Sequence, residues 1–337
     1  MARINRSPDN APPPNPRQPN ERQRVRRRSL TRMLLRPDVL VLGAGGILGE
    51  AWMMGVLAGI EDAADLDLRE CEAFVGTSAG SIVATHLAVG RSPRRPSTVS
   101  TEIELASAHP ASALVAGAIT GARRAGGMAL TAWSPLAPLA LAATAPGGAL
   151  VRAAALAALP RPQATLFDLR RRVAEYGARF DGRLRVVCVD RRRGRRTVFG
   201  SPGAPPASVA EAVAASCSVP WLFAPVEIAG REYVDGGVWS ATNLDAAPAT
   251  RDTHVLCLNP TAGVRGAQAL LAVARNLARS AVSIEALALR RRGAVVRTVH
   301  PNLECAAAMG GDFMDAEPRG RVLAAGYRQG LTVASSE

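Results

Sequence analysis

The stretch that most constrains this fold is Gly-Thr-Ser-Ala-Gly at positions 76–80. Apolar residues 73–75 predict the end of a buried strand, and the small, apolar residues 81–89 predict a helix. A serine on a sharp strand-to-helix turn is a nucleophile elbow, and its flanking glycines prevent collisions around a strained backbone. The pattern predicts that Ser78 is an exposed nucleophile at a helix N-terminus. Taken alone, it is equally typical of an ordinary small-residue turn.

A glycine-rich loop lies upstream of this turn, also between a strand and a helix. Residues 39–42 are apolar, residues 43–49 read Gly-Ala-Gly-Gly-Ile-Leu-Gly, and residues 50–60 predict an apolar helix. Consecutive glycines at a helix N-terminus expose backbone N–H groups, which stabilise an anion there. The two loops together predict a nucleophilic serine beside an oxyanion hole.

The net charge of +13 belongs mainly to the N-terminal residues. Residues 1–36 hold ten arginines against Asp9 and Glu21, a net +8 that leaves +5 for the rest. This proline- and arginine-rich composition predicts a disordered tail. The tail is a solvated extension or a site for anionic lipid headgroups, and we expect no nucleic acid partner. No apolar segment typical of a secretory signal precedes Pro37, so a cytoplasmic protein, peripheral at the membrane, is expected.

The chain changes character over residues 91–165, which are rich in Ala, Leu, Gly and Pro. Residues 125–151 carry no charge, but prolines and a Gly-Gly pair divide this run into pieces too short to span a bilayer. We expect an apolar helical cap here, either as core packing or as a lid over the Ser78 pocket. Its expected apolar residues are Met128, Leu130, Trp133, Leu136 and Leu139.

Further elements follow from periodicity and turn signals. Residues 208–216 predict a helix, with Ser208 as N-cap and Glu211 at the spacing of a capping box. The other expected elements are a strand at 183–190 with a hairpin partner at 195–200, a hairpin over 227–238, strands at 253–258 and 294–299, and helices at 268–292 and 316–329.

The cysteines do not indicate a metal or disulfide framework. They are five, widely spaced, mostly in apolar sequence and without a C-x-x-C pair: Cys71, Cys188, Cys217, Cys257 and Cys305. Such cysteines behave as small core residues in a reducing compartment. We therefore expect no metal and no cofactor.

Four motifs, in this order and at fitting separations, resemble those of the patatin-like phospholipase family. They are the loop at 45–49, the elbow at 76–80, Ala-Ser-Cys-Ser-Val-Pro at 215–220, and Tyr-Val-Asp-Gly-Gly at 233–237. The resemblance covers about residues 38–250. It implies a three-layer α/β/α fold with a mainly parallel central sheet, and a Ser–Asp dyad that hydrolyses lipid acyl esters.

The resemblance also implies roles for particular residues. Ser78 carries over as the nucleophile and Asp235 as the catalytic aspartate, while Gly45, Gly46 and Ile47 carry over as the oxyanion hole. The remaining motif glycines are Gly49, Gly76, Gly80, Gly236 and Gly237. Two residues depart from the family pattern, because Ala44 replaces a usual glycine and Leu48 replaces a usual Arg or Lys.

A dyad without histidine is chemically sufficient. A carboxylate within hydrogen-bond reach, in a pocket poor in water, can take the serine proton, and loop amides can hold the oxyanion. We therefore expect structural roles for the histidines, which are His86, His109, His254 and His300.

Three alternatives compete with this interpretation. An α/β-hydrolase needs several strands before its elbow, and only one β-α unit precedes Ser78. A dinucleotide-binding loop needs a small residue where Leu48 stands. The third is a catalytically weak or inactive lipid- or membrane-binding protein of the same fold.

The expected domain organisation has three parts. Residues 1–36 form the basic tail, residues 37–250 form the catalytic domain with the cap inserted at about 91–165, and residues 251–337 form a strand and helix extension packed on it. The expected activity is that of a phospholipase A, lysophospholipase or esterase. The expected partners are a lipid acyl ester and an anionic membrane surface, contacted through the arginine tail and the cap.

Overall fold

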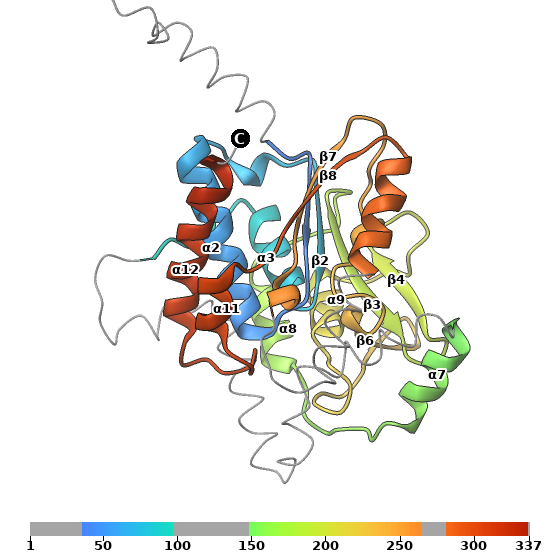
Figure 1. Cartoon of the computed structure of the whole chain (residues 1–337). Coiled ribbons are helices and arrows are strands. Elements are labelled where there is room, and N and C mark those ends of the chain that lie inside the picture. Colours follow the sequence, from blue (N-terminus) through green and yellow to red (C-terminus); the bar gives the residue numbers. More distant parts are fainter. Residues whose placement is uncertain (1–35, 97–147, 264–280, 336–337) are drawn as a thin grey trace, which may run out of the picture.

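The computed structural model describes residues 36–96, 148–263 and 281–335. These ranges form one eight-stranded sheet with helices against both faces (Figure 1). The strands follow the order β5-β6-β3-β2-β1-β7-β8, and β4 pairs with β3. Their bounds are β1 Val39–Leu42, β2 Ala73–Thr77, β3 Leu184–Asp190, β4 Arg195–Phe199, β5 Val226–Ile228, β6 Arg231–Asp235, β7 His254–Leu258 and β8 Val295–Val299.

Neighbouring strands β3, β2, β1, β7 and β8 run parallel, while β4 and β6 are antiparallel to β3. All four residues of β1 and all five of β2 are buried. Both faces of a parallel sheet are covered, so its strands read as continuous apolar runs. The predicted mainly parallel central sheet is confirmed.

One face of the sheet is covered by helices α2 Gly46–Ala64, α3 Ala79–Ala88, α9 Val209–Ser216 and α12 Arg319–Ser335. Figure 1 shows α2 (blue) beside α12 (red) on this side. These two helices approach closely, because a Cβ on Gly55 would lie 2.2 Å from the Leu323 carbonyl oxygen and one on Gly59 would lie 2.2 Å from that of Tyr327.

The opposite face is covered by a helical segment over residues 281–291, drawn in orange in Figure 1. Its Val282, Ala286 and Leu289 pack in one buried cluster with Val39 and Val41 of β1. Alternate residues of β1 therefore serve two cores, as strand geometry requires. With helices on both faces of the sheet, the predicted three-layer fold is confirmed.

The described elements follow most of the expectations. The predicted 195–200 hairpin partner is β4, the predicted 227–238 hairpin is β5 with β6, and Ser208 and Glu211 form a complete capping box. The last helix begins at Arg319 and continues to Ser335, later than the predicted 316–329. Helix α7 Gly148–Ala158 lies within residues 91–165, where short helices were expected, whereas the sequence patterns did not single out helices α8 Phe167–Ala174 and α11 Leu303–Met309.

Several expectations fall outside the described residues. They concern the tail up to residue 35, the cap residues between 97 and 147, His109 and the predicted helix up to residue 280. Among the helices that the structure describes, none is both long and apolar enough to cross a membrane. All five cysteines are free and buried, as their apolar surroundings predicted.

Candidate active site

Ser78 occupies the turn between β2 and α3. Its backbone has φ 53° and ψ −124°, a left-handed conformation that is unusual for a residue with a side chain. Such strain at a strand-to-helix turn is typical of a nucleophile elbow. The turn is held by Ser81, whose N–H and hydroxyl both donate to the Ser78 carbonyl oxygen, at 2.8 and 2.6 Å. Ser78 is only 6% exposed, so the prediction that it is an exposed residue is wrong, although its place at the N-terminus of α3 is as expected.

The glycines on either side of Ser78 are required by close backbone contacts. A Cβ on Gly76 would lie 2.4 Å from Ser81 Cα, and one on Gly80 would lie 1.9 Å from the Leu42 carbonyl oxygen. Gly80 therefore allows α3 to start directly against the end of β1. That contact brings the elbow to the glycine-rich loop, which begins one residue after Leu42.

Asp235 ends β6, which is antiparallel to β3 and pairs Asp235 with Cys188. The following Gly236 has no room for a side chain, since a Cβ would lie 2.3 Å from the Val187 carbonyl oxygen. The Asp235 carboxylate accepts the N–H of Gly237 at 2.7 Å, and the Ser78 side chain lies close enough to lower the pKa of this carboxyl. The two residues expected to form the dyad are thus brought together from positions far apart in the chain.

The Asp235 carboxyl is 1% exposed, and burial raises its pKa to about 7 from an ordinary value of 3.8. Burial removes the water that stabilises the charged form, and the hydrogen bonds from Ser78 and Gly237 oppose this effect only in part. A carboxylate with a pKa near neutrality is a stronger base than an exposed aspartate, which suits proton abstraction from a hydroxyl.

The glycine-rich loop offers unpaired N–H groups. In the part of the chain that the structure describes, the N–H groups of Gly45, Gly46 and Ile47 donate to no acceptor. Their neighbours are occupied, because the Ala44 N–H donates to the Ala241 carbonyl oxygen at 2.7 Å and the Leu48 N–H to that of Phe313 at 3.1 Å. The loop can therefore bind an oxyanion through three consecutive amides, and Ala44 takes no part.

Residues from distant parts of the sequence fix this loop in place. A Cβ on Gly45 would lie 2.6 Å from Pro260 Cβ, and one on Gly46 would lie 2.8 Å from the Phe313 carbonyl oxygen. Leu48 is fully buried in the core beneath α2, which accounts for an apolar side chain at this position. The region after residue 251, which was expected as an extension, thus packs against the glycine-rich loop.

A small cavity of about 20 Å³ lies at Ser78, enough for one water-sized group. Among its ten lining residues only Glu50 is charged. The others include Gly46, Ile47, Cys217 and Met314. An apolar lining with little room for water strengthens hydrogen bonds to a developing charge.

The Glu50 side chain is 1% exposed and forms ion pairs with two arginines. Arg319 lies 2.8 Å from Glu50 Oε2, and Arg94 binds Glu50 Oε1. A buried carboxylate needs such partners to remain charged. The ion pair with Arg319 also joins the N-terminal part of α2 to the start of α12.

The motif at 215–220, quoted from the sequence only for its resemblance, contacts both expected catalytic residues. Ser216 Oγ accepts the backbone N–H of Ser78 at 2.9 Å and donates to the Val187 carbonyl oxygen at 2.7 Å. The Ser218 carbonyl oxygen accepts the Asp235 N–H at 3.0 Å. No local pattern signals these contacts, because they depend on where α9 ends in space.

A second supporting residue that the sequence reasoning missed is Asn243. It is fully buried, and its side-chain amide donates to the Thr77 hydroxyl at 3.1 Å and to the Gly236 carbonyl oxygen at 3.2 Å. These acceptors directly adjoin Ser78 and Asp235. The nearest sequence signal is the position of Asn243 eight residues after the aspartate, which alone does not suggest such a bridge.

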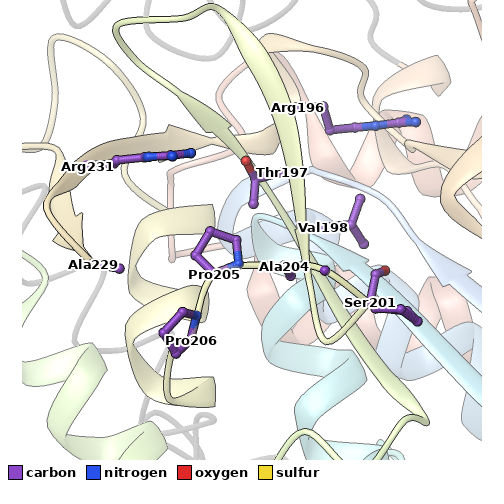
Figure 2. Close-up of a pocket in the computed structure, with 11 residues that line it drawn as sticks. Arg196, Thr197, Val198, Ser201, Ala204, Pro205, Pro206, Ala229 and Arg231 are labelled. Carbon is purple, nitrogen blue, oxygen red and sulfur yellow. The ribbon is translucent and has the colours of Figure 1, made fainter.

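A larger cavity lies away from this site, as a groove of about 650 Å³ along β4. Figure 2 shows Arg196, Arg231 and residues of the segment at 201–206 among its lining. None of the residues expected at the catalytic site lines it. Arg196 is engaged elsewhere, because it donates to the carboxylate of Asp245. Cavity size therefore does not locate the chemistry in this protein.

The histidines of the described ranges have other surroundings. His86 is buried in the last turn of α3 and pairs through Nε2 with the Ser92 carbonyl oxygen at 2.9 Å. His254 starts β7, at the sheet edge opposite to the one where β2 ends. Within those ranges, no group of His, Cys, Asp and Glu side chains could hold a metal ion.

Known proteins resemble this chain in fold and in sequence pattern. The crystal structure of VipD from Legionella pneumophila aligns with a TM-score of 0.44 and 16% sequence identity, covering 89% of this chain and 67% of VipD. No curated protein matches the sequence. A sequence profile described as patatin-like phospholipase matches residues 40–248, which is more than half of the chain. The chain therefore belongs to the patatin-like phospholipase family.

Proposed function

We propose that this protein is a serine hydrolase of lipid acyl esters, of the phospholipase A, lysophospholipase or esterase type. The observation that carries the proposal is the closeness of the Ser78 side chain, on its strand-to-helix turn, to the buried Asp235 carboxyl, whose pKa it lowers. The unpaired amides of Gly45 and Gly46 near Ser78 support it.

In the first half of the reaction, Ser78 Oγ attacks the ester carbonyl carbon while its proton passes to the Asp235 carboxylate. The oxyanion that forms is held by the N–H groups of Gly45, Gly46 and Ile47. When the carbon–oxygen bond of the ester breaks, the leaving alcohol takes the proton from Asp235 and the acyl group stays on Ser78.

In the second half, water attacks the acyl-Ser78 ester and gives a proton to Asp235. Collapse of this second oxyanion releases a carboxylic acid, and Ser78 regains the proton. No cofactor is needed for this sequence. The lipid substrate would be met at a membrane, and we propose that the arginine tail and the apolar cap contribute to peripheral binding there.

The test is covalent labelling with a fluorophosphonate together with turnover on phospholipids, lysophospholipids, neutral glycerides and short p-nitrophenyl esters. Ser78→Ala should lose both labelling and turnover on every substrate that the wild type hydrolyses. Ser201→Ala is the matched control, because Ser201 lies in the groove along β4 and should leave both unchanged.

Undiminished labelling of folded Ser78→Ala would contradict the assignment of the nucleophile. A wild-type protein that binds lipid but neither labels nor turns over any substrate would instead identify a non-catalytic lipid-binding protein of the same fold.

A further inference from the structure

Helix α7 buries its charged residue and exposes apolar residues to solvent, the inverse of the usual arrangement. Its one charged residue, Arg152, points inward and is 1% exposed, stacked 4.3 Å from the centre of the Trp239 ring. Leu150 is 84% exposed and Val151 is 48% exposed. The other exposed positions of the helix are Ala154, Ala157 and Ala158. A surface helix of a water-soluble domain normally shows the reverse pattern, so this face is suited to an apolar surrounding.

The inversion is fixed by contacts with the turn between β3 and β4. Arg152 donates to the Gly194 carbonyl oxygen at 2.8 Å, and Arg191 donates to that of Leu156 at 3.0 Å. Gly194 has a positive φ of 59° and would place a Cβ 2.2 Å from the Ala149 carbonyl oxygen. Helix α7 therefore lies directly on this turn and cannot rotate its apolar face inward without losing these bonds.

The same turn places basic side chains beside the apolar face. Arg192, Arg193 and Arg195 are exposed. The carboxylates nearby neutralise these arginines only in part. Arg193 Nε lies 4.0 Å from Asp190 Oδ2, whereas Glu232 pairs with Arg161 and Arg191, and within the described residues no carboxylate pairs with Arg192 or Arg195. An exposed apolar helix face edged by arginines has the chemistry that anionic lipid surfaces bind.

The sheet register puts this surface at the edge that carries Ser78. Strand β3 runs parallel to β2, and Val187 pairs with Thr77, the residue before Ser78. Asp190 lies three residues further along β3, about 10 Å beyond that level at 3.3 Å per residue. Figure 1 shows α7 near the ends of β3 and β6. Trp239, on which Arg152 stacks, follows Asp235 by four residues.

We propose that the exposed face of α7 and the arginines of the β3–β4 turn form a docking surface for an anionic lipid bilayer. This inference rests on the proposed function for its biological use. It assigns the contact to a specific surface of the folded domain, distinct from the arginine tail. Docking through it turns the edge that carries Ser78 toward the bilayer.

The experiment measures cosedimentation of the full chain with vesicles of equal parts phosphatidylcholine and phosphatidylglycerol, at low and high salt. Leu150→Ser/Val151→Ser should weaken binding by about tenfold. Replacing Arg192, Arg193 and Arg195 by Gln should weaken it by about fivefold for each arginine at low salt. Matched controls are Leu303→Ser, whose side chain is 71% exposed on α11, and the exposed Arg321→Gln on α12. Both should bind as the wild type does.

Three outcomes would overturn the proposal. The first is vesicle binding equal to wild type in both sets of variants, the expected result where another segment of the chain covers this face. The second is a dimer that dissociates in Leu150→Ser/Val151→Ser, which would identify a second copy as the occupant. The third is equal weakening in the control variants.

The readouts separate this surface from the proposed chemistry. Turnover of a soluble short-chain p-nitrophenyl ester should be unchanged in the α7 variants, because none of the substituted residues lines the Ser78 cavity. A protein that docks through α7 but hydrolyses no ester would refute the proposed function and leave the docking surface standing.

Discussion

The side-chain amide of Asn243 donates to the Thr77 hydroxyl across 3.1 Å, although 166 positions separate the two residues in the chain. The same amide donates to Gly236 and to Ser240 carbonyl oxygens. Asn243 itself holds a left-handed conformation with φ 49°, which asparagine tolerates better than most residues. One buried amide thereby sets the distance between the end of β2, directly before Ser78, and the turn that follows Asp235.

The first prediction concerns this spacing. Asn243→Asp keeps the size and the backbone preference but replaces the donating amide by an acceptor, which repels the carbonyl oxygens of Gly236 and Ser240. We expect kcat to fall by about ten- to a hundredfold, the cost of small misplacements between reacting groups. The measurement is steady-state turnover of a soluble ester, with folding checked by circular dichroism.

Asn302→Asp is the matched control for Asn243→Asp. Asn302 caps α11 by accepting the Cys305 N–H through Oδ1, a role that aspartate also fulfils. Equal loss of kcat in the two variants, or none in Asn243→Asp, would show that Asn243 does not position the site.

The second prediction concerns the pH dependence of turnover. With its pKa raised to about 7, Asp235 is protonated in acid and becomes the base only as the pH rises through neutrality. The profile of kcat/KM should therefore rise with an acid limb near pH 7. Asp235→Asn should reduce turnover by about a hundred- to ten-thousandfold and abolish this limb. A wild-type limb near pH 4 would show that the base is an ordinary exposed carboxylate.

The third prediction concerns stability, since the same burial disfavours the charged form in the folded protein. The folded state keeps the Asp235 proton up to about pH 7, whereas an unfolded chain loses it near 3.8. The free energy of unfolding should therefore fall as the pH rises from 4 to 7, and Asp235→Asn should escape this loss. At pH 8 the variant should be more stable than wild type by on the order of 2–4 kcal/mol. Urea denaturation at pH 4 and pH 8 measures the difference, which should nearly vanish at pH 4.

The fourth prediction concerns the histidines. His86→Gln, His254→Gln and His300→Gln should keep most of the wild-type turnover, because within the described residues the groups that lower the pKa of the Asp235 carboxyl are Ser78 and Gly237, and no histidine is among them. Initial rates on a soluble ester, compared at equal folded fraction, provide the check. A folded histidine variant as inactive as Asp235→Asn would favour a Ser-His-Asp triad instead.

The fifth prediction concerns the contact between the elbow and β1. Gly80→Ala would place a methyl group 1.9 Å from the Leu42 carbonyl oxygen, so we expect destabilisation by about 3 kcal/mol or more. Gly320→Ala, in α12, meets no atom within 4 Å and should gain about 0.5 kcal/mol. Thermal denaturation distinguishes the two, and similar melting temperatures would contradict the packing described for Gly80.

Much of the fold could be predicted because its signals are local. The apolar runs of β1 and β2 indicate strands buried on both faces, and the glycines after them indicate tight strand-to-helix turns. The capping box of Ser208 and Glu211 marks the start of α9, and this signal spans only four residues. The position of Ser78 on a strand-to-helix turn was also predictable, because the elbow pattern lies within five consecutive residues and its backbone requirements are steric. The catalytic role expected for Asp235 was inferred from the resemblance to the family, because an Asp-Gly-Gly turn alone is common.

The tertiary structure decided what depends on residues distant in sequence. The approach of Ser78 to Asp235 requires β6 to pair antiparallel with β3, and the raised pKa of Asp235 requires the burial that this pairing produces. The three unpaired amides of the glycine-rich loop are set off by the carbonyl groups of Ala241 and Phe313, which accept the N–H groups of Ala44 and Leu48 on either side. The inverted face of α7 is equally non-local, because only a partner such as Trp239 makes an inward arginine favourable. Local sequence sets backbone conformation through sterics, whereas these features depend on which groups folding brings within a few ångströms of each other.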